Sequence, residues 1–557
     1  MAVDALRAPP GMELSDAVLQ RWEAHVREVT VLYNAAECSA AAARLLAALR
    51  TAPMLAAELF SDEELLLADD TEPGTHPDEP NLTMAELMNV EAEAPSLVYL
   101  ARALRSSRCS APEQGVKLLQ ASLALLPRQN AQLRLLRRPL RMALAEARRG
   151  ICAWRQHEAE ERWLVKSLSE KGAAGWRQLT AVLTLAFPIT PPQWLRISRA
   201  TLPTAGHLPS HPHARLTGPP SRKPLRVAIV TADNVRTHVL AHLQHATYRL
   251  FSPRMVRLFV VSMLAVEPAI AAHIATSLGH RRDALISVEN LKPAEAARKI
   301  ATARIQLLLW VSEPGEGLRT LLAQRPAPVS THHLAVPATT GCDAVHYFTL
   351  DGTAASMPSA ARSMSERAVL LPNHYQVNSH ALGLGPVGAE QLPDAPRRWR
   401  WSHASIANFG QTIRLDPTLL ATLGHVLMRT RTLLWLAAPG SLPRLRAELA
   451  ALGIHQGRRC VISPRLGWNG YAARATAATL YVDTLYYNSH TTNVDMLWAG
   501  VPSLTARGGS LSSRVGAAVG RAAGMPDATV TSLRQYSMTA TRLVIEPHRR
   551  DSVSIYQ

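Results

Sequence analysis

Histidine, threonine and aspartate stand together in the segment TLYVDTLYYNSHTTNVDMLWAGVPSLTARGG, where a strand pattern and a polar loop precede a helix pattern. His490, Thr491 and Thr492 lie where this helix is expected to begin. Hydroxyl side chains at a helix start cap its free N–H groups, and those groups, at the positive end of the helix dipole, bind phosphate oxygens. Asp495 follows one turn later, where a carboxylate can accept hydrogen bonds from ribose hydroxyls. The segment fits a nucleoside diphosphate, although the same spacing also fits a capped core helix without a ligand.

Other patterns of chemically active residues lack the context that their chemistry needs. Three histidines lie in a segment broken by prolines, without a nearby carboxylate or cysteine, and are expected to be solvated: His207, His211 and His213. The glycines of ALGLGPVGAE have the spacing G-x-G-x-x-G but follow no strand and open no helix, so we interpret them as a loop. The five cysteines are far apart and form no C-x-x-C pair. Reduced thiols and no structural metal are expected.

The elements that must position these residues fall into a helical part and an α/β part. Over residues 1–200, leucine and alanine recur at helical spacing, which predicts an α-helical region, and degenerate tetratricopeptide-like repeats are one interpretation of it. Residues 201–223 are rich in proline, glycine and serine and are interpreted as a linker. Beyond them, apolar runs such as RVAIVTAD and TLLWLAAPG alternate with helical patterns. This alternation predicts two lobes with parallel sheets, over residues 224–395 and 396–557.

Length, composition and charge narrow the class of protein. A chain of 557 residues exceeds the size at which a single core keeps growing. No apolar run reaches the ~18 residues of a membrane span, and no targeting signal is readable, so a cytosolic or nuclear protein is expected. The net charge of +17 comes from arginines spread along the chain, without a basic tail or stripe. Nucleic acid is therefore not the expected partner.

The stretch HTTNVDMLWAG resembles the uridine-diphosphate-binding segment of the O-linked N-acetylglucosamine (O-GlcNAc) transferases, glycosyltransferase family 41, where a His-Thr-Thr triplet and a nearby Asp precede Leu-Trp-Ala-Gly. Further stretches between about residues 152 and 537 resemble the family in the same order: CAWRQHEAEERWLV, LRVAIVTAD, RPAPVSTHHLAVPATTG, SERAVLLPNHY, ANFGQTIRLDP and SSRVGAA. The resemblance implies an α/β fold of the GT-B type, with two Rossmann-like lobes. It also implies sugar transfer that needs no metal and inverts the sugar carbon.

The resemblance assigns roles to individual residues. His238 matches the family's active-site histidine after the first strand, if one residue is inserted in DNVRTHVLAH, and His242 matches a second histidine one turn later. Gln411 matches a glutamine that contacts the nucleotide diphosphate. Arg414 stands where the family has a lysine that neutralises the leaving group, and it keeps the positive charge with a planar, forked geometry. His238 and Arg414 are thus the expected catalytic residues.

Other positions depart from the family. After CVISP, where the family covers the uridine with a lysine and a histidine, this chain has Trp468 and Tyr471, and of the family residues there only Arg474 is retained. The loop LWVSEPGEG lacks the paired asparagines of the sugar site, and PATTG replaces Pro-Gly-Thr-Ser-Gly. Aromatic rings could stack on the base in place of the missing residues.

The resulting expectation is a protein O-GlcNAc transferase that uses UDP-N-acetylglucosamine (UDP-GlcNAc) as donor and Ser or Thr hydroxyls of proteins as acceptors, without a cofactor. Two alternatives stay open. One is a related transferase with another donor or acceptor, such as fucose from GDP-fucose or glucose onto asparagine. The other is a binding or scaffold protein that keeps the fold without catalysis, which the departures at the lysine and asparagine positions favour.

Overall fold

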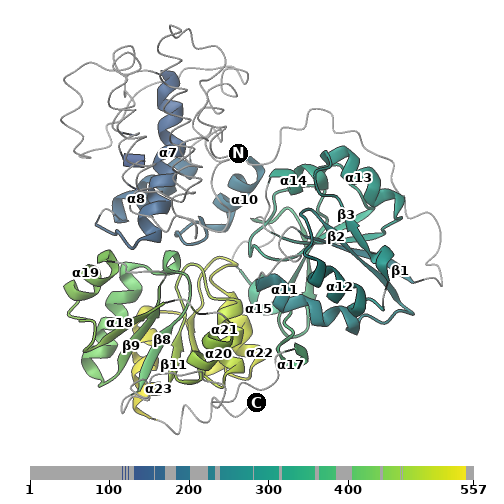
Figure 1. Ribbon diagram of the computed structural model, residues 1–557. Coiled ribbons are helices and arrows are strands. Elements are labelled where there is room, and N and C mark those ends of the chain that lie inside the picture. Colours follow the sequence, from purple (N-terminus) through teal and green to yellow (C-terminus); the bar gives the residue numbers. More distant parts are fainter. Residues whose placement is uncertain are drawn as a thin grey trace. The chain divides into compact units, whose positions relative to one another are not determined.

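The computed structural model divides the chain into two compact units, Met1–Thr180 and Ala181–Gln557 (Figure 1). It describes residues 131–155, 157–169, 184–200, 224–231, 239–279, 281–312, 316–357, 363–383, 404–438, 443–464 and 468–546, with the single residues 116, 119, 120, 123 and 466. The acidic stretch SDEELLLADDTEPGTHPDEP, residues 61–80, and the predicted linker 201–223 lie outside these ranges. In the described part of the chain, no helix has the length and apolar character needed to cross a membrane.

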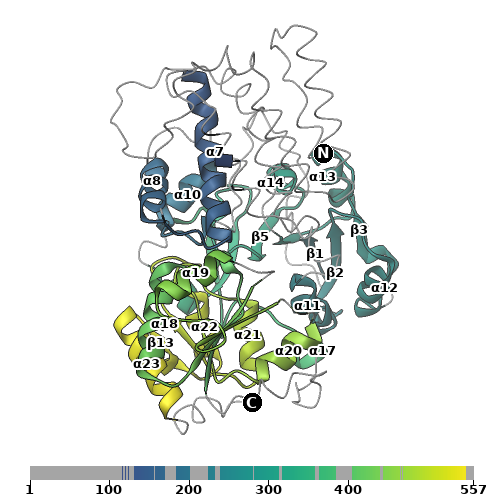
Figure 2. The ribbon, with the colours of Figure 1, turned by 60° about the vertical axis from the view of Figure 1, so that its left-hand side comes forward.

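The described part of the first unit is a pair of helices, α7 (Ala131–Gly150) and α8 (His157–Ser169), which lie side by side (Figure 2). The second half of α7 is mostly buried, and Arg149 Nη1 lies 3.5 Å from Glu161 Oε1 on α8. Within this unit, apolar burial and ion pairs together hold the two helices against each other.

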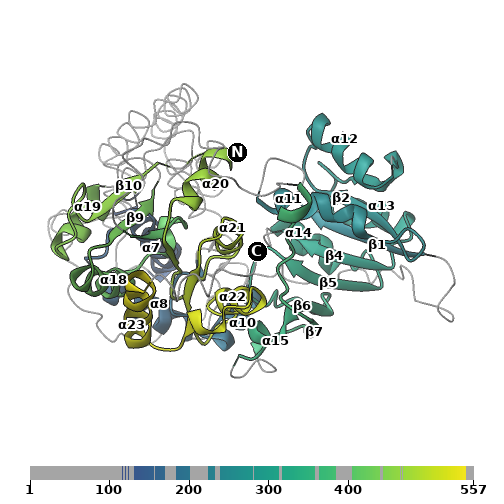
Figure 3. The same cartoon turned by 90° about the horizontal axis from the view of Figure 1, so that it is seen from below.

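The first lobe of the second unit is a parallel sheet of seven strands in the order β3-β2-β1-β4-β5-β6-β7. Figure 3 shows β4 to β7 succeeding one another on one side of β1. The strands are β1 (Leu225–Thr231), β2 (Val256–Ser262), β3 (Leu285–Ser287), β4 (Leu307–Val311), β5 (Val329–Leu334), β6 (Tyr347–Asp351) and β7 (Arg367–Leu371). Six of these strands coincide with apolar runs in the sequence, while the short β3 was not predicted.

Helices cover both faces of the middle of this sheet, which explains why β1, β2 and β4 are continuous apolar runs rather than alternating ones. On β1, Val227 and Ile229 pack in one cluster with residues of α11 (Val239–Gln244) and α12 (Pro268–Ser277). Ala228 and Val230 face the other way, toward α13 (Pro293–Thr302) and α14 (Glu316–Ala323). The lobe also contains the short helices η3 (His245–Leu250), η4 (Arg282–Ala284), α15 (Gly352–Ala355) and α17 (His380–Gly383).

The second lobe is a parallel sheet of six strands in the order β10-β9-β8-β11-β12-β13. Its strands are β8 (Ser405–Asn408), β9 (Leu433–Ala437), β10 (Cys460–Ser463), β11 (Leu480–Val482), β12 (Ser503–Ala506) and β13 (Thr529–Val530). Its helices are η7 (Thr412–Arg414), α18 (Pro417–Arg429), α19 (Pro443–Ala451), α20 (Trp468–Thr476), α21 (Thr491–Trp498), α22 (Val515–Ala522), η8 (Pro526–Ala528) and α23 (Leu533–Ile545). This is the Rossmann strand order. All strands are parallel, but successive strands are added on one side of β8 as far as β10 and on its other side from β11 onward. Ligands of such sheets bind beyond the carboxyl ends of the strands at this change of side.

The two lobes contact each other through α21 and α22. Val494 of α21 and Val515 of α22 belong to the same buried cluster as Ile229 of the first sheet. Arg514, just before α22, donates from Nε to the Thr353 carbonyl at 3.1 Å and from Nη2 to a serine hydroxyl of the first lobe at 2.7 Å. The predicted pair of Rossmann-like lobes is thus confirmed. The two α/β lobes pack against each other within the second compact unit.

Helix α10 (Pro191–Ala200) lies in the second compact unit, although its sequence continues the helical pattern of the N-terminal region. Trp194 Nε1 and Ser198 Oγ both donate to the Thr339 carbonyl, at 3.3 and 2.9 Å. Gly341 has a φ of +69°, and a Cβ added there would lie 2.7 Å from the Arg199 nitrogen. The PATTG loop therefore packs backbone to backbone against α10.

Candidate nucleotide-binding site

The loop that follows β11 is held by the buried carboxylate of Asp483. Oδ1 of Asp483 accepts hydrogen bonds from the backbone N–H groups of Thr484 and Ser489, at 2.9 and 2.7 Å. Oδ2 accepts from the Thr505 hydroxyl at 3.1 Å. One side chain thus closes residues 483–489 into a compact loop directly before α21.

Asn488 connects this loop to three other segments. Its Nδ2 donates to the Thr484 carbonyl at 2.6 Å, and its Oδ1 accepts from the Gly516 N–H at 3.2 Å. Its backbone N–H donates to the Ser512 carbonyl at 2.9 Å. Its own carbonyl accepts from Arg414 Nη1 at 2.9 Å. The loop after β11 and the loop after β8 are therefore joined through Arg414.

Burial raises the pKa of Asp483 to about 6, against the opposing effect of the three hydrogen bonds that it accepts. Because this folded-state pKa lies above the ordinary value of 3.8, the folded protein binds more protons than the unfolded chain between about pH 4 and 6. The contribution of Asp483 to the free energy of unfolding therefore falls as pH rises through this window, by on the order of 3 kcal/mol for about two pKa units.

We expect Asp483→Asn to remove this pH-dependent contribution. Urea denaturation of wild type and variant at pH 4, 5, 6 and 7 measures it as the difference between their unfolding free energies. The unfolding free energy of the wild type, relative to that of the variant, should fall by on the order of 3 kcal/mol from pH 4 to pH 7. A difference that stays constant with pH would contradict the raised pKa.

Arg414 lies at the end of η7, in the loop that follows β8. Its guanidinium carbon lies 3.8 Å above the centre of the Tyr487 ring, a cation–π contact. Its Nε is buried and has no hydrogen-bond partner in the described part of the protein. Gln411 begins the same turn with an exposed side chain. A Cβ added at Gly410 would lie 3.4 Å from Ser489 Oγ, so this loop lies directly against the loop after β11.

The start of α21 differs from the prediction in one respect. The helix begins at Thr491 as expected, but the residue at the N-cap is His490, and no side chain caps the first turn. Thr491 and Thr492 are inside the helix, so their hydroxyls are past the capping position; Thr491 Oγ1 instead accepts from Gln376 Nε2 at 3.4 Å. The expectation that hydroxyl groups cap this helix is wrong. The first-turn N–H groups are consequently not occupied by a side-chain cap.

The imidazole of His490, the residue before the first turn, is partly buried, and its Nε2 atom is shielded from solvent. Burial lowers its pKa well below the ordinary range, and the charge of Arg414 lowers it further. The ring is therefore neutral at physiological pH, and it lies edge-on to Tyr487 with 5.5 Å between ring centres. A neutral imidazole can donate or accept a hydrogen bond, depending on its tautomer.

Asp495 lies one turn into α21 and forms a buried pair with His380 of the first lobe. His380 Nε2 and Asp495 Oδ1 are 2.7 Å apart, and the side chains are 4% and 8% exposed. Asp495 is one of the sequence-predicted site residues, whereas His380 is not. No sequence signal identifies this partner, since it lies 115 residues away in a short helix of the other lobe.

Arg474 of α20 is buried near the same loops, but it is engaged by the protein. Its Nη1 donates to Ser463 Oγ at 3.0 Å and to the Pro464 carbonyl at 2.8 Å. Its guanidinium carbon lies 4.3 Å from the centre of the Phe409 ring, and burial lowers its pKa to about 10. Arg474 thus links the end of β10 to the loop after β8. The side chain of the neighbouring Trp468 lies outside the described residues.

The structure brings most of the sequence-predicted residues together and leaves two unplaced. Contacts connect the loops and helix start that carry Gln411, Arg414, His490, Thr491, Thr492 and Asp495. His238 follows β1 in a stretch outside the described residues, and of His242 only the backbone, in α11, is described. Their predicted roles stay predictions.

Several buried polar atoms around this region lack a hydrogen-bond partner within the described residues. They are His374 Nδ1, Gln376 Oε1, Arg414 Nε, His490 Nε2 and both amide atoms of Asn493. Buried polar atoms in proteins are almost always paired, so these atoms are candidates for hydrogen bonds to a bound ligand or water. Sequence reasoning missed Gln376 and Asn493; Asp483, at the carboxyl end of β11, could have been found from its place after a predicted strand.

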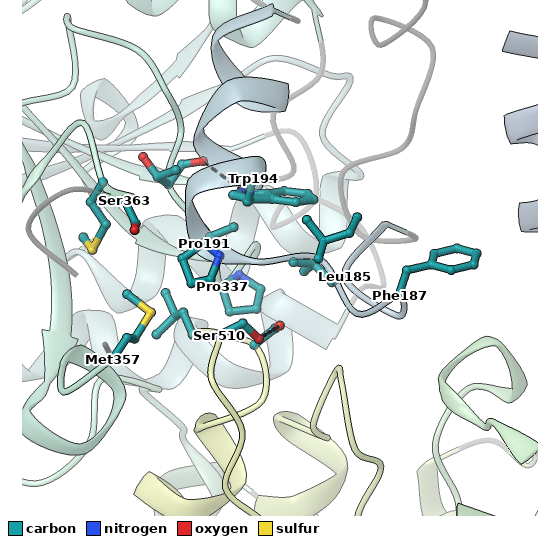
Figure 4. A pocket seen from close by; sticks show the side chains of 14 residues that line it. Leu185, Phe187, Pro191, Trp194, Pro337, Met357, Ser363 and Ser510 are labelled. Atoms are coloured by element: carbon teal, nitrogen blue, oxygen red, sulfur yellow. Dashed lines mark hydrogen bonds between the residues drawn. The ribbon is translucent and has the colours of Figure 1, made fainter. Parts of the chain in front are cut away.

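An apolar pocket of about 30 Å³ lies elsewhere in the second unit and is lined by residues such as Trp194, Met357 and Leu511 (Figure 4). None of the sequence-predicted site residues lines it. In the described ranges, no three His, Cys, Asp or Glu side chains are grouped so that they could hold a metal ion.

The second lobe matches a family of known proteins. Residues 402–554 match the family model described as Glycosyl transferase family 41. A probable UDP-N-acetylglucosamine–peptide N-acetylglucosaminyltransferase of Arabidopsis thaliana is 26% identical over 380 residues, which are 65% of this chain and 38% of that protein. A Caenorhabditis elegans protein named as the same kind of transferase is 30% identical over 140 residues, 24% of this chain and 12% of its own length.

Among solved structures, a mutant O-GlcNAc transferase of Thermobaculum terrenum superposes with a TM-score of 0.62 at 18% identity, covering 85% of this chain and 93% of that one. This likeness concerns the fold. Residues 402–554, the second lobe, carry the similarity to glycosyl transferase family 41, and the chain spans less than half the length of the curated relatives that it matches.

Proposed function

We propose that this protein transfers N-acetylglucosamine from UDP-GlcNAc to Ser or Thr hydroxyls of other proteins. The observation that carries the proposal is the meeting of Arg414 with the uncapped start of α21, beyond the carboxyl ends of β8 and β11. A cation and a helix N-terminus at this point of a Rossmann-like sheet form a binding site for a diphosphate. The names of the relatives support the choice of UDP-GlcNAc and of a peptide acceptor.

In the proposed reaction, the bond between the anomeric carbon and the diphosphate oxygen breaks while the acceptor hydroxyl attacks the opposite side of that carbon. Negative charge grows on the departing UDP, and Arg414 together with the N–H groups of α21 stabilises it. The hydroxyl proton leaves toward a base. His238, which follows β1, is the residue we propose to accept this proton or to orient the hydroxyl.

Arg414 also favours a second candidate function, a UDP-binding protein without transferase activity. Its guanidinium is already engaged by the Asn488 carbonyl and the Tyr487 ring, which limits its freedom to follow a leaving group. Such a protein would keep the donor site and use it for binding alone.

The experiment is transfer of labelled N-acetylglucosamine from UDP-GlcNAc to an acceptor-protein mixture, beside calorimetric titration of the same preparation with UDP. We expect UDP binding and transfer, and a loss of roughly 10²–10⁴-fold in transfer for His238→Ala with little change in UDP affinity. GDP-fucose and UDP-glucose are run in parallel, and transfer from either of these alone would replace the proposed donor. UDP binding without transfer would establish the second candidate, and a lack of UDP binding would overturn both.

A further inference from the structure

A buried hydrogen bond between a histidine and an aspartate joins the two lobes at the proposed donor site. Asp495 belongs to α21 of the second lobe, whereas His380 begins α17, after the last strand of the first sheet. Their hydrogen bond of 2.7 Å is buried on both sides. The carboxylate that the sequence analysis connects with ribose recognition is therefore held by the opposite lobe.

The position of His380 is fixed by its surroundings. Its ring lies 5.8 Å from the ring of Trp498, one turn beyond Asp495 on α21. The segment before His380 also contacts α21, since Gln376 Nε2 donates to Thr491 Oγ1 at 3.4 Å. Residues 376–380 of the first lobe thus run along the same face of α21 that carries Thr491 and Asp495.

A carboxylate recognises two neighbouring hydroxyls only if its plane is set correctly. If Oδ1 lost this donor, the carboxylate would turn toward other N–H groups or toward water, because a buried carboxylate is stabilised by the hydrogen bonds that it accepts. His380 supplies this donor and so orients the carboxylate. The orientation in turn depends on contact between the lobes, because the donor and the carboxylate belong to different sheets.

We propose that His380 is a positioning residue that sets Asp495 for hydrogen bonds to the ribose, and that it thereby makes the site selective for ribonucleoside over deoxyribonucleoside diphosphates. The inference rests on the proposed function, which supplies UDP as the ligand. It extends that function by giving the first lobe a part in recognising the nucleoside. Selectivity for the ribose would then depend on contact between the two lobes.

The test measures dissociation constants for UDP, 2′-deoxy-UDP and 3′-deoxy-UDP by calorimetry on the full chain. Hydrogen bonds to a charged group correspond to roughly 10- to 100-fold in affinity, so wild type should prefer UDP by that factor over at least one deoxy analogue. His380→Leu removes the donor and should bring the preference close to one. Asp495→Asn should reduce it as well.

Two polar variants keep the test independent of folding defects. In His380→Gln, the terminal amide nitrogen lies near the position of Nε2 and can still donate to Asp495. In His380→Asn, the amide lies near the position of Nδ1 and is too far from Asp495 to donate to it. We expect the preference to survive in His380→Gln and to be lost in His380→Asn. His425→Asn, at an exposed position of α18 in the second lobe, is the matched control and should behave as wild type.

The outcomes separate the inference from the function on which it rests. Full preference for UDP in both His380→Leu and His380→Asn would overturn the role of His380 while leaving UDP binding and the proposed function intact. A wild type that binds UDP and both deoxy analogues equally well would overturn ribose recognition at this site. A wild type that binds none of the three would overturn the proposed function together with the inference.

Discussion

Arg414→Ala is expected to lower kcat for sugar transfer by roughly 10³-fold while it weakens binding of the donor UDP-GlcNAc far less. The reason is that the leaving diphosphate carries more negative charge in the transition state than in the bound donor. An interaction that strengthens during the reaction contributes to kcat, whereas one that is equal in both states contributes to KM. Steady-state kinetics with UDP-GlcNAc measure kcat, and calorimetric titration with UDP-GlcNAc in the absence of acceptor protein measures donor binding.

Two control variants test whether the positive charge and its position at residue 414 matter. Arg414→Lys retains a cation but loses the fork that bonds the Asn488 carbonyl and stacks on Tyr487, so an intermediate loss is expected. Arg458→Ala, at an exposed site in the same lobe, removes the same charge elsewhere and should leave kcat unchanged. Equal losses of kcat and of affinity for UDP-GlcNAc in Arg414→Ala would show that Arg414 only binds the donor.

Gly516→Ala is expected to destabilise the second lobe by about 3 kcal/mol, the upper range for forcing an extra methyl group into a packed core. A Cβ at this position would collide with Asp483 Oδ2 and would lie 2.5 Å from Thr505 Oγ1. These are the atoms whose hydrogen bond helps to fix the loop before α21. Urea denaturation measures the loss, and UDP binding should weaken along with stability.

A second glycine in the same helix provides the matched control. At Gly520 the added Cβ would meet only the Met525 carbonyl at 3.7 Å and Thr529 Oγ1 at 3.8 Å, which are ordinary contacts. Because alanine is favoured over glycine by about 1 kcal/mol in a helix interior, Gly520→Ala should be neutral or slightly stabilising. Similar stabilities for both variants would mean that Asp483 and Thr505 can move aside at little cost.

The fold could be predicted from the sequence because its main signals are local. Each strand of a buried parallel sheet is an apolar run, and strands such as Leu225–Thr231 and Leu433–Ala437 are long enough to be recognised. Leu285–Ser287 and Thr529–Val530 have three and two residues and cannot be distinguished from loops by pattern. Their strand conformation comes from pairing with a neighbouring strand, which is a property of the folded chain.

The site could be predicted in part, for the same reason. Residues from Asp483 to Asp495 are close in sequence, so the strand, loop and helix that carry them are visible as one pattern. The contacts that complete this pattern join residues from distant segments, as Gln376 does with Thr491 and His380 with Asp495. The capping error arose because the helix start was predicted within one residue, while a side-chain cap requires the hydroxyl at one definite position.

The packing of α10 against the PATTG loop bears on how a recombinant catalytic fragment should be designed. A gene fragment that starts at the first strand would remove both side chains that donate to the Thr339 carbonyl and would leave this buried acceptor without them. It would also expose the backbone at Gly341, which packs directly against the backbone of Ser198 and Arg199. An expression fragment should therefore start no later than about residue 184, so that this helix is produced together with the lobe that it completes.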